Sequence, residues 1–355
     1  MTRCVVVTGA AGFIGSNLVR HLLEESRDVD IVGLDALTYS GSITTLEDLL
    51  DHPRLTFVRG DIRDRELIRD LLAEHQPVGI IHLAAESHVD RSIVDPLQFV
   101  ETNVVGTVVL LQEAAKAWRD SGGRFHHVST DEVFGELGDE GSFSEESTYA
   151  PNSPYSASKA AADHFVRAWS RSYGLEYVLT NCTNNYGPYQ FPEKLIPMTI
   201  TRATAGEAVP VYGTGENVRD WLFVEDHCRA LALAFDKGRA CTTYTIGGET
   251  EIPNLELVHM VLDSLDRQLG NEPESSKRLV EFVGDRPGHD YRYAMDISRI
   301  KADLGWSPSV SLREGIDRTV AWYLGNQEWL RAVQSDDHHG FQRSWYADRS
   351  RHVES

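Results

Sequence analysis

The chain has 355 residues, of which 41% are hydrophobic and 25% are charged, as in a globular protein with one large domain or two interleaved ones. Its formal net charge of −20 argues against nonspecific nucleic-acid binding, which needs clustered lysine and arginine. No apolar run approaches the roughly 18 residues of a membrane span, and the first residues lead straight into a predicted strand. We therefore expect no membrane partner, no signal peptide and a cytoplasmic location.

Short β-branched runs alternate with amphipathic stretches through the first half of the chain. Strands are predicted at 4–8, 31–35, 55–58, 79–83, 125–129 and 176–180, and helices at 14–25, 65–74, 102–118 and 155–173. Continuous apolar strands separated by helices are typical of a parallel sheet covered on both faces. The predicted fold class is therefore α/β, with a Rossmann-like, doubly wound parallel sheet.

The pattern changes after about residue 185, where prolines and glycines separate shorter elements. We predict a dinucleotide-binding domain over 1–185 and a smaller, interleaved domain over 186–330 at the carboxyl ends of the strands. Residues 225–248 are expected to return to the first domain. Residues 331–355 are polar and are interpreted as a tail, whereas the acidic segment 136–150 has no assigned role.

The cysteines give no sign of a metal site. Cys4, Cys182, Cys228 and Cys241 show no CxxC spacing, so neither a zinc site nor a disulfide framework is predicted, and no metal ion is expected. We expect the cysteines to be buried small apolar residues in a reducing compartment.

A glycine-rich turn follows the first predicted strand and opens the first helix. Gly9, Gly12 and Gly15 suit a tight turn, a close approach to a pyrophosphate and close helix–sheet packing, with the helix N-terminus facing the phosphates. Asp35 ends the second strand, where a carboxylate would accept both ribose hydroxyls and repel a 2′-phosphate. NAD is therefore favoured over NADP.

Tyr155 and Lys159 are four residues apart on a predicted helix and so share a face. Tyrosine is a weak base at neutral pH because its pKa is near ~10, and a neighbouring ammonium favours the phenolate. Ser129 or Thr130, at the end of the fifth strand, could hydrogen-bond the reacting hydroxyl. Together they are a redox set for a sugar carbinol.

Two acids, Asp131 and Glu132, directly follow Thr130. A plain oxidoreductase or epimerase does not need this additional acid and base, so the pair indicates an enzyme that oxidises, eliminates water and reduces again. A solvated turn is the alternative, but ligands bind at the carboxyl ends of the strands in this fold. Burial and the Glu132 charge would raise the pKa of Asp131, as a general acid requires.

These motifs carry a family resemblance over residues 8 to about 306. The chain resembles the extended short-chain dehydrogenases/reductases that act on nucleotide sugars, and among them the dTDP-glucose 4,6-dehydratases. The glycine motif and the Tyr-x-x-x-Lys spacing are common to the superfamily, whereas residues 86–92 (ESHVDRS) and 130–133 (TDEV) are specific to the narrower group. Phe134, where the family usually has Tyr, and Ala36, where Lys is frequent, depart from the pattern.

The resemblance implies a three-stage reaction on dTDP-glucose, with tightly bound NAD that is regenerated in each turnover. Tyr155 would take the O4 proton while Thr130 holds O4 and the C4 hydride leaves to NAD. Glu132 would then take the C5 proton and Asp131 would protonate the leaving C6 hydroxyl, after which hydride returns to C6. Lys159 would favour the phenolate and hold the nicotinamide ribose. The resemblance also implies a homodimer through the helices at 102–118 and 155–173.

Further contacts follow from the resemblance. The implied cofactor contacts are Gly9, Gly12, Phe13, Ile14, Gly15, Asp35, Ala36, Leu37, Thr38, Asp61, Ile62, Leu83, Ala84, Ala85, Ser87, Thr102, Ser129, Tyr155, Lys159 and Asn185. The implied substrate contacts are Ser87, Thr130, Asn184, Lys194, Leu195, Pro210, Val211, Tyr212, Arg219, Asn254, Asp285, Arg286 and His289. The cations among them suit a diphosphate, whereas Leu195 and Val211 would suit core packing nearly as well.

Other functions remain open from the residues alone. A 4-epimerase or decarboxylase would keep the glycine motif and the Tyr–Lys pair, but would not need the two acids. A dehydratase acting on another nucleotide diphosphate hexose would differ only in a few loop contacts. A regulatory or scaffold protein with this fold would be expected to lack Tyr155, Lys159 or the acids, and all are present.

Overall fold

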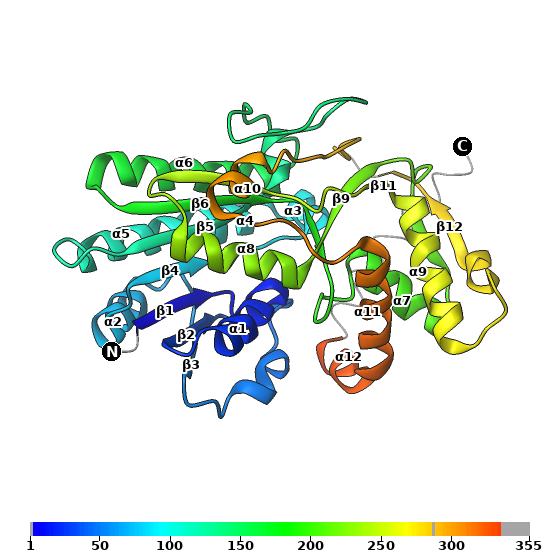
Figure 1. Cartoon of the computed structure of the whole chain (residues 1–355), viewed down its shortest axis with the longest axis horizontal. Coiled ribbons are helices and arrows are strands. Elements are labelled where there is room, and N and C mark those ends of the chain that lie inside the picture. Colours follow the sequence, from blue (N-terminus) through cyan, green and yellow to red (C-terminus); the bar gives the residue numbers. More distant parts are fainter. Residues whose placement is uncertain (1–2, 286–287, 335–355) are drawn as a thin grey trace.

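A computed structural model describes residues 3–285 and 288–334 of the chain. Seven parallel strands form its main sheet, in the spatial order β3-β2-β1-β4-β5-β6-β10 (Figure 1). They are β1 (Arg3–Thr8), β2 (Val29–Asp35), β3 (Leu55–Arg59), β4 (Gly79–His82), β5 (Arg124–Thr130), β6 (Glu176–Cys182) and β10 (Thr242–Ile246). The predicted doubly wound α/β class is therefore confirmed.

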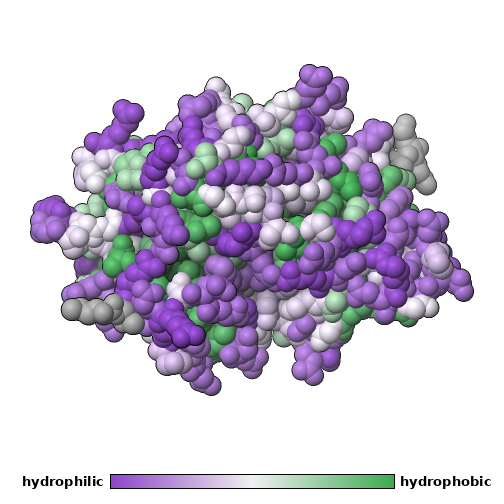
Figure 2. Space-filling view, in the orientation of Figure 1, coloured by the Kyte–Doolittle hydropathy of each residue, from purple (hydrophilic) through white to green (hydrophobic). Residues whose placement is uncertain are grey.

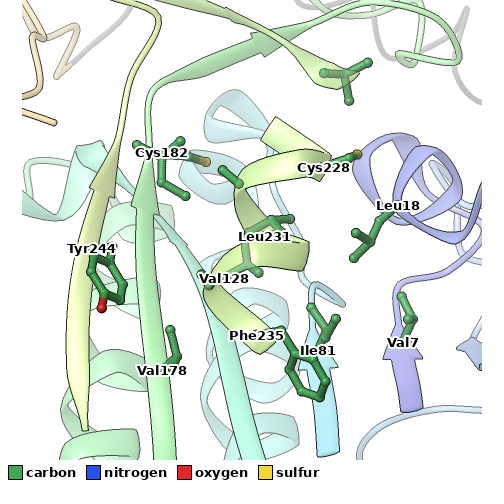
Figure 3. Packing of buried hydrophobic residues seen from close by; sticks show 14 of the residues in the cluster. Val7, Leu18, Ile81, Val128, Val178, Cys182, Cys228, Leu231, Phe235 and Tyr244 are labelled. Carbon is green, nitrogen blue, oxygen red and sulfur yellow. The ribbon is translucent and has the colours of Figure 1, made fainter. Parts of the chain in front are cut away.

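Both faces of this sheet are buried, which explains its continuous apolar strands. In β1, Val5 and Val7 contribute to one core and Val6 to the other. Helices α1 (Phe13–Glu25) and α8 (Val224–Lys237) cover the first face, where Leu231 and Phe235 of α8 lie against the strands (Figure 3). Helices α2 (Arg65–His75), α5 (Thr107–Ala117) and α6 (Pro154–Tyr173) cover the other.

A second core lies beside the carboxyl ends of the main strands, toward the right of Figure 1. It contains a three-stranded sheet of β7 (Asn184–Tyr186), β9 (Val218–Phe223) and β11 (Glu251–Pro253), and a parallel pair of β8 (Val209–Tyr212) and β12 (Val280–Val283). Helices α7 (Leu195–Thr204), α9 (Asn254–Leu269) and α11 (Leu312–Gly325) pack around them. Because β10 belongs to the main sheet and α8 packs on it, the two regions are interleaved along the sequence.

Short helical elements complete the part of the chain that the structure describes. They are η1 (Ile43–Leu49), α3 (Val89–Val94), α4 (Pro96–Phe99), η2 (Val100–Gly106), η3 (Asp131–Phe134), η4 (Ser275–Leu279), α10 (Ser298–Leu304) and α12 (Gln327–Val333). Residues 335–355, most of the segment interpreted as a tail, lie outside the described residues.

The predicted single helix over 102–118 is wrong in its start and its form. Helical structure begins at Pro96, runs through a π-helical segment over 100–106, and becomes regular only in α5. Asn103 in this segment is buried, and its amide bonds both the backbone N–H and the backbone carbonyl of Glu86, at 2.8 and 2.9 Å, and also Ser158. The wider turn thus carries a buried polar anchor, which hydrophobic periodicity does not reveal.

The cysteines do not all follow the expectation. Cys182 and Cys228 are buried and Cys4 is half-buried, but Cys241 is exposed, so the expectation is wrong for Cys241. It lies in a turn with φ of 55°, just before β10, where the chain returns to the sheet.

Hydrophilic residues dominate the face shown in Figure 2, and hydrophobic ones occupy small areas between them. None of the described helices combines the length and the apolar character that a membrane crossing requires.

Candidate active site

One cleft collects the predicted residues of both regions. It runs from the glycine turn across the ends of β2, β4 and β5 to β7 and residues 190–194. Every predicted cofactor residue except Leu37 lines it, as do the five predicted catalytic residues. This is the carboxyl edge of the parallel sheet, where doubly wound folds bind their ligands.

The glycine turn leaves no room for larger residues. Gly9 has φ of +70°, and a Cβ built there would lie 2.8 Å from the backbone nitrogen of Ala84. A Cβ on Gly15 would lie 2.0 Å from the carbonyl oxygen of Gly9. Helix α1 therefore begins directly against the strand ends, with its free N–H groups toward the cleft, which fits the pyrophosphate of a dinucleotide.

Asp35 ends β2 as a buried carboxylate on the cleft. Burial raises its pKa, while hydrogen bonds from the backbone N–H groups of Leu37 (2.8 Å) and Ala11 (2.9 Å) oppose that rise. Leu37 thus contributes its backbone and does not line the cleft. The two bonds fix the carboxylate beside the glycine turn, as a ribose-binding acid requires.

Strand β5 delivers the acid pair through a tight turn. Thr130 ends the strand and caps η3, because its hydroxyl accepts the backbone N–H of Glu132 at 3.3 Å and donates to Asp131 at 3.1 Å. Asp131 is only 2% exposed. Burial, and after it the Glu132 charge, raises the pKa of Asp131 well above its usual range, which favours the protonated carboxyl.

Helix α6 supplies Tyr155 and Lys159 one turn apart, and both side chains are buried. Burial raises the pKa of Tyr155 well above 10 and nearby acids raise it further, whereas a hydrogen bond with Thr130 lowers it. Lys159 Nζ donates to the carbonyl oxygen of Val128 at 2.8 Å. The Ser129 hydroxyl donates instead to Asp163, at 3.0 Å. Of the two hydroxyls considered for the reacting group, Thr130 is therefore the one that faces Tyr155.

The predicted substrate residues divide into two groups. Ser87, Thr130, Asn184 and Lys194 line the cleft, and Lys194 Nζ donates to the carbonyl oxygen of Ser87 at 3.1 Å, which joins the two regions. The others lie on second-region elements outside the lining of the cleft, and Arg286 is outside the described residues. These others are Leu195, Pro210, Val211, Tyr212, Arg219, Asn254, Asp285 and His289.

The surroundings of several members of this outer group are defined. Val211 is 2% exposed and belongs to the second core. His289 Nδ1 lies 2.7 Å from a carboxylate oxygen of Asp285. Arg219 is buried, donates to the backbone carbonyls of residues 290 and 291 at 2.7 and 3.1 Å, and lowers the pKa of Asp131. Its charge therefore reaches the acid pair from the second region.

Comparison with known proteins decides the family. A family model described as GDP-mannose 4,6 dehydratase matches residues 6–319. The dTDP-glucose 4,6-dehydratase of Escherichia coli is 49% identical over 354 residues, or 95% of this chain and 98% of that protein. The one from Xanthomonas campestris pv. campestris is 52% identical over 337 residues, or 92% and 95%. This chain belongs to the dTDP-glucose 4,6-dehydratase family. The predicted resemblance is thereby confirmed.

A solved structure of the family shares the fold. The crystal structure of dTDP-glucose 4,6-dehydratase from Streptomyces venezuelae, with NAD and TDP bound, matches with a TM-score of 0.87 at 47% identity. The match covers 93% of this chain and all 100% of that one. The cofactor cleft thus has its counterpart in a protein that binds NAD.

Phe134, the departure from the usual tyrosine of the family, packs in an apolar setting. It is buried, stacks on Phe143 with ring centroids 5.2 Å apart, and meets the ring of Tyr149 edge-on at 5.2 Å. Both partners come from the acidic segment 136–150, whose role the sequence left open. This segment therefore closes over the turn that carries the acid pair.

Sequence reasoning missed several residues of the cleft. Glu193 lines it, accepts a hydrogen bond from Tyr39 at 3.1 Å, and has its pKa raised by burial to about 7. Its two neighbours in the sequence, Lys194 and Leu195, were expected to contact the substrate, but Glu193 itself was not. The position of this acid directly before the expected ligand Lys194 was the sequence signal that could have identified it. Cys182, Thr183, Gln190 and Phe191 also line the cleft and carried no distinctive pattern.

Proposed function

We propose that this protein is an NAD-dependent dTDP-glucose 4,6-dehydratase, a hydro-lyase. It converts dTDP-α-D-glucose to dTDP-4-keto-6-deoxy-α-D-glucose and water. One observation carries the proposal: Asp131 and Glu132 follow Thr130 into the cleft that also holds Tyr155 and Lys159. The cleft thus combines a redox set with an acid and a base, and the relatives named above carry out this reaction.

When bound, NAD supplies the acceptor for the C4 hydride and the donor of hydride to C6. The glycine turn would hold its pyrophosphate and Asp35 its adenosine ribose, as their geometry suits. Lys159 would hold the nicotinamide ribose. The cofactor is regenerated in each turnover, so it is best kept bound throughout the cycle.

Tyr155 acts as the base toward the O4 hydroxyl of the sugar, and Thr130 holds that oxygen. Because burial strongly favours the neutral phenol, the base needs a positive charge nearby. Lys159, one turn along α6, supplies that charge.

Glu132 removes the C5 proton, which the new 4-ketone makes acidic. Asp131 gives its proton to the leaving C6 hydroxyl, and the C5–C6 bond becomes a double bond as water departs. The raised pKa of Asp131 favours the protonated form that this step needs. Return of hydride to C6, with a proton to C5, completes the product.

The anionic nucleotide must bind to local cations, because the whole chain carries a formal charge of −20. Lys194 stands on the cleft, and we propose that Arg219, Arg286 and His289 complete the diphosphate site. A 4-epimerase or decarboxylase is the second candidate, but it leaves the acid pair without a role.

A homodimer in the cytoplasm is part of the proposal. Five apolar side chains beside or on α6 are exposed by between 37% and 70% of their surface. They are Val94, Leu97, Val100, Val105 and Phe165. A second copy would cover them through α5 and α6, as expected from the resemblance.

The test is incubation of the purified protein with dTDP-glucose and no added NAD. We expect the sugar nucleotide to lose one water by mass spectrometry, the alkaline chromophore of a 4-keto sugar to appear, and no net NADH to form. An epimerised product of unchanged mass would favour the second candidate. No reaction even with added NAD would remove dTDP-glucose as the substrate.

A further inference from the structure

A carboxylate lies behind the redox pair. Asp163 stands on α6 one turn after Lys159 and two turns after Tyr155, so the three residues share one face of the helix. Asp163 is 0% exposed. It does not line the cleft, and no step of the proposed reaction uses it. A buried carboxylate has a high desolvation cost, so its surroundings must compensate.

The four side chains around Asp163 come from three different parts of the chain. Its Oδ2 accepts hydrogen bonds from Tyr149 Oη at 2.8 Å, Ser129 Oγ at 3.0 Å and Asn181 Nδ2 at 3.4 Å. Its Oδ1 lies 3.1 Å from Nε2 of His127. Asn181 also donates to the backbone carbonyl of the residue after Ser129, at 3.0 Å. One carboxylate thus gathers the end of β5, the neighbouring strand β6 and the segment that closes over the acid pair.

The groups around Asp163 differ in their charge at neutral pH. Although burial opposes ionisation, the nearby His127 ring and the charge of Lys159 contribute to a lowered pKa of Asp163, so the carboxylate is an anion. Burial lowers the pKa of His127 to about 4, which leaves this ring neutral at pH 7. Arg167 donates to Tyr149 at 2.9 Å and adds a positive charge at the outer side.

Burial also disfavours the charged form of Lys159. Burial lowers the pKa of its ammonium group, and the negative charge of Asp163 is the largest influence that raises it. The thiol of Cys182 also faces Lys159, but it is neutral at pH 7 because burial raises its pKa to about 12. His127 and His82 also face Lys159 and are held neutral by burial, so they contribute no anion.

We propose that Asp163 is a positioning residue for the redox chemistry, which holds Lys159 as a cation and fixes the end of β5 through Ser129 and Asn181. It acts through Lys159 and Thr130, and it does not touch the reacting atoms. Its effect on Lys159 is argued from their shared face of α6 and from charge, whereas its effect on turnover rests on the proposed function.

The first experiment titrates Lys159 directly and needs no substrate. The chain has only six lysines, so ¹³Cε-labelled lysine gives six NMR signals, and Lys159→Met identifies the one of interest. We expect Asp163→Asn to lower the pKa of Lys159 by about one unit or more and to leave the other lysines unmoved. An unmoved Lys159 would overturn the proposal.

Asp266→Asn is the matched control. Asp266 is 1% exposed and accepts hydrogen bonds from Ser275, Ser276 and Asn271, but it lies on α9 in the second region. Its substitution should leave the Lys159 signal in place. If Asp163→Asn does not fold, the wild-type titration still decides. A Lys159 cationic at neutral pH supports the proposal, and a neutral one contradicts it.

The second experiment compares the pH dependence of dTDP-glucose turnover. Loss of the Lys159 proton sets the alkaline limb, because the neutral amine no longer favours the Tyr155 phenolate. Asp163→Asn should therefore move that limb about one pH unit lower, reduce kcat about tenfold on that limb, and leave KM within about twofold. A merely structural role would lower kcat evenly at every pH. If the wild type is inactive, the proposed function fails, and the NMR titration still judges Asp163.

Discussion

Asp131 and Glu132 are neighbours in the sequence, yet the turn η3 places them in different surroundings. Asp131 is 2% exposed, whereas Glu132 is half-buried on the cleft. Two titratable groups with different surroundings can divide acid and base work between them. This division depends on Thr130, because its hydroxyl bonds both residues of the turn.

The substitution Asp131→Asn separates the two roles. An amide keeps the shape and cannot deliver the proton, so we expect kcat to fall by about 10² to 10⁴. Glu132 should still remove the C5 proton in this variant. In D₂O, mass spectrometry of the recovered sugar nucleotide should then find deuterium without loss of water. Glu132→Gln is the control and should give neither. Normal turnover by Asp131→Asn would remove Asp131 as the acid.

The same residue predicts a pH dependence of stability. Folding raises the pKa of Asp131 above its ordinary value of 3.8, so the folded state binds this proton more tightly than the unfolded state. The resulting stabilisation is complete below that ordinary value and is lost as pH rises through the folded pKa. Asn cannot ionise, so the unfolding free energy of Asp131→Asn does not carry this loss. Relative to that of the wild type, it should rise by about 1.4 kcal/mol per pH unit in that window. Urea unfolding of both proteins at about pH 5 and pH 8 measures this difference in unfolding free energy. The same difference at both pH values would contradict the prediction.

At the scale of elements, helix α6 begins with a capping box two residues before Tyr155. Ser153 Oγ accepts the backbone N–H of Ser156 at 3.1 Å, and Ser156 Oγ accepts that of Ser153 at 3.0 Å. Ser153→Ala should cost about 1 kcal/mol of unfolding free energy and also reduce kcat, because the start of α6 sets the position of Tyr155. Ser311→Ala, which removes the cap of α11, should cost similar stability and leave kcat unchanged. Equal kcat values in the two variants would show that the cap does not position Tyr155.

The elements also show which features the sequence could predict. Strands such as 4–8 and helices such as 155–173 were found within one or two residues of their bounds, because hydrophobic spacing dictates them. The π-helical segment around Asn103 was missed because its cause is one buried polar side chain. The pairing of β10 with β6 joins residues far apart in the sequence, which no local pattern specifies.

The site divides in the same way. Gly9, Asp35 and the Tyr155–Lys159 pair carry spacing signals, and the structure brings them to one cleft. Asp163 carries none, since a single acid on an amphipathic helix looks like a solvated residue. Only the fold reveals that it faces inward. The substrate contacts expected in the second region were implied by the family resemblance. Where they lie relative to the cleft depends on how the two regions pack, which no local sequence pattern specifies.

At the scale of the whole molecule, two regions with separate cores share one cleft. Lys194 bridges them by its bond to the carbonyl oxygen of Ser87, and Arg219 extends the charge of the second region to Asp131. Because β10 and α8 return to the main sheet after β9, the chain crosses between the regions more than once. This interleaving ties the regions together, so Tyr155 and Lys159 keep a fixed position relative to the cations of the second region.

The exposed apolar side chains beside α6 give the last prediction, on the proposed dimer. Leu97 on α4 is 70% exposed and Val105 is 47% exposed, and α4 and η2 both pack on α6. Leu97→Glu with Val105→Glu would place charges in the proposed interface, so sedimentation velocity should find monomers in place of dimers. Leu269→Glu, at a residue 46% exposed on α9, is the control and should remain dimeric.

The dimer should also matter for catalysis, because α4 touches the redox set. Phe99, in α4, meets the ring of Tyr155 edge-on with centroids 6.3 Å apart, and the two form a small core with Val89. A partner that covered Leu97 would therefore hold the element that packs on Tyr155. We expect the double variant to lose kcat severalfold with unchanged NAD content. A wild type that sediments as a monomer would contradict the proposed dimer. A monomeric variant with full kcat would show that the dimer does not support catalysis.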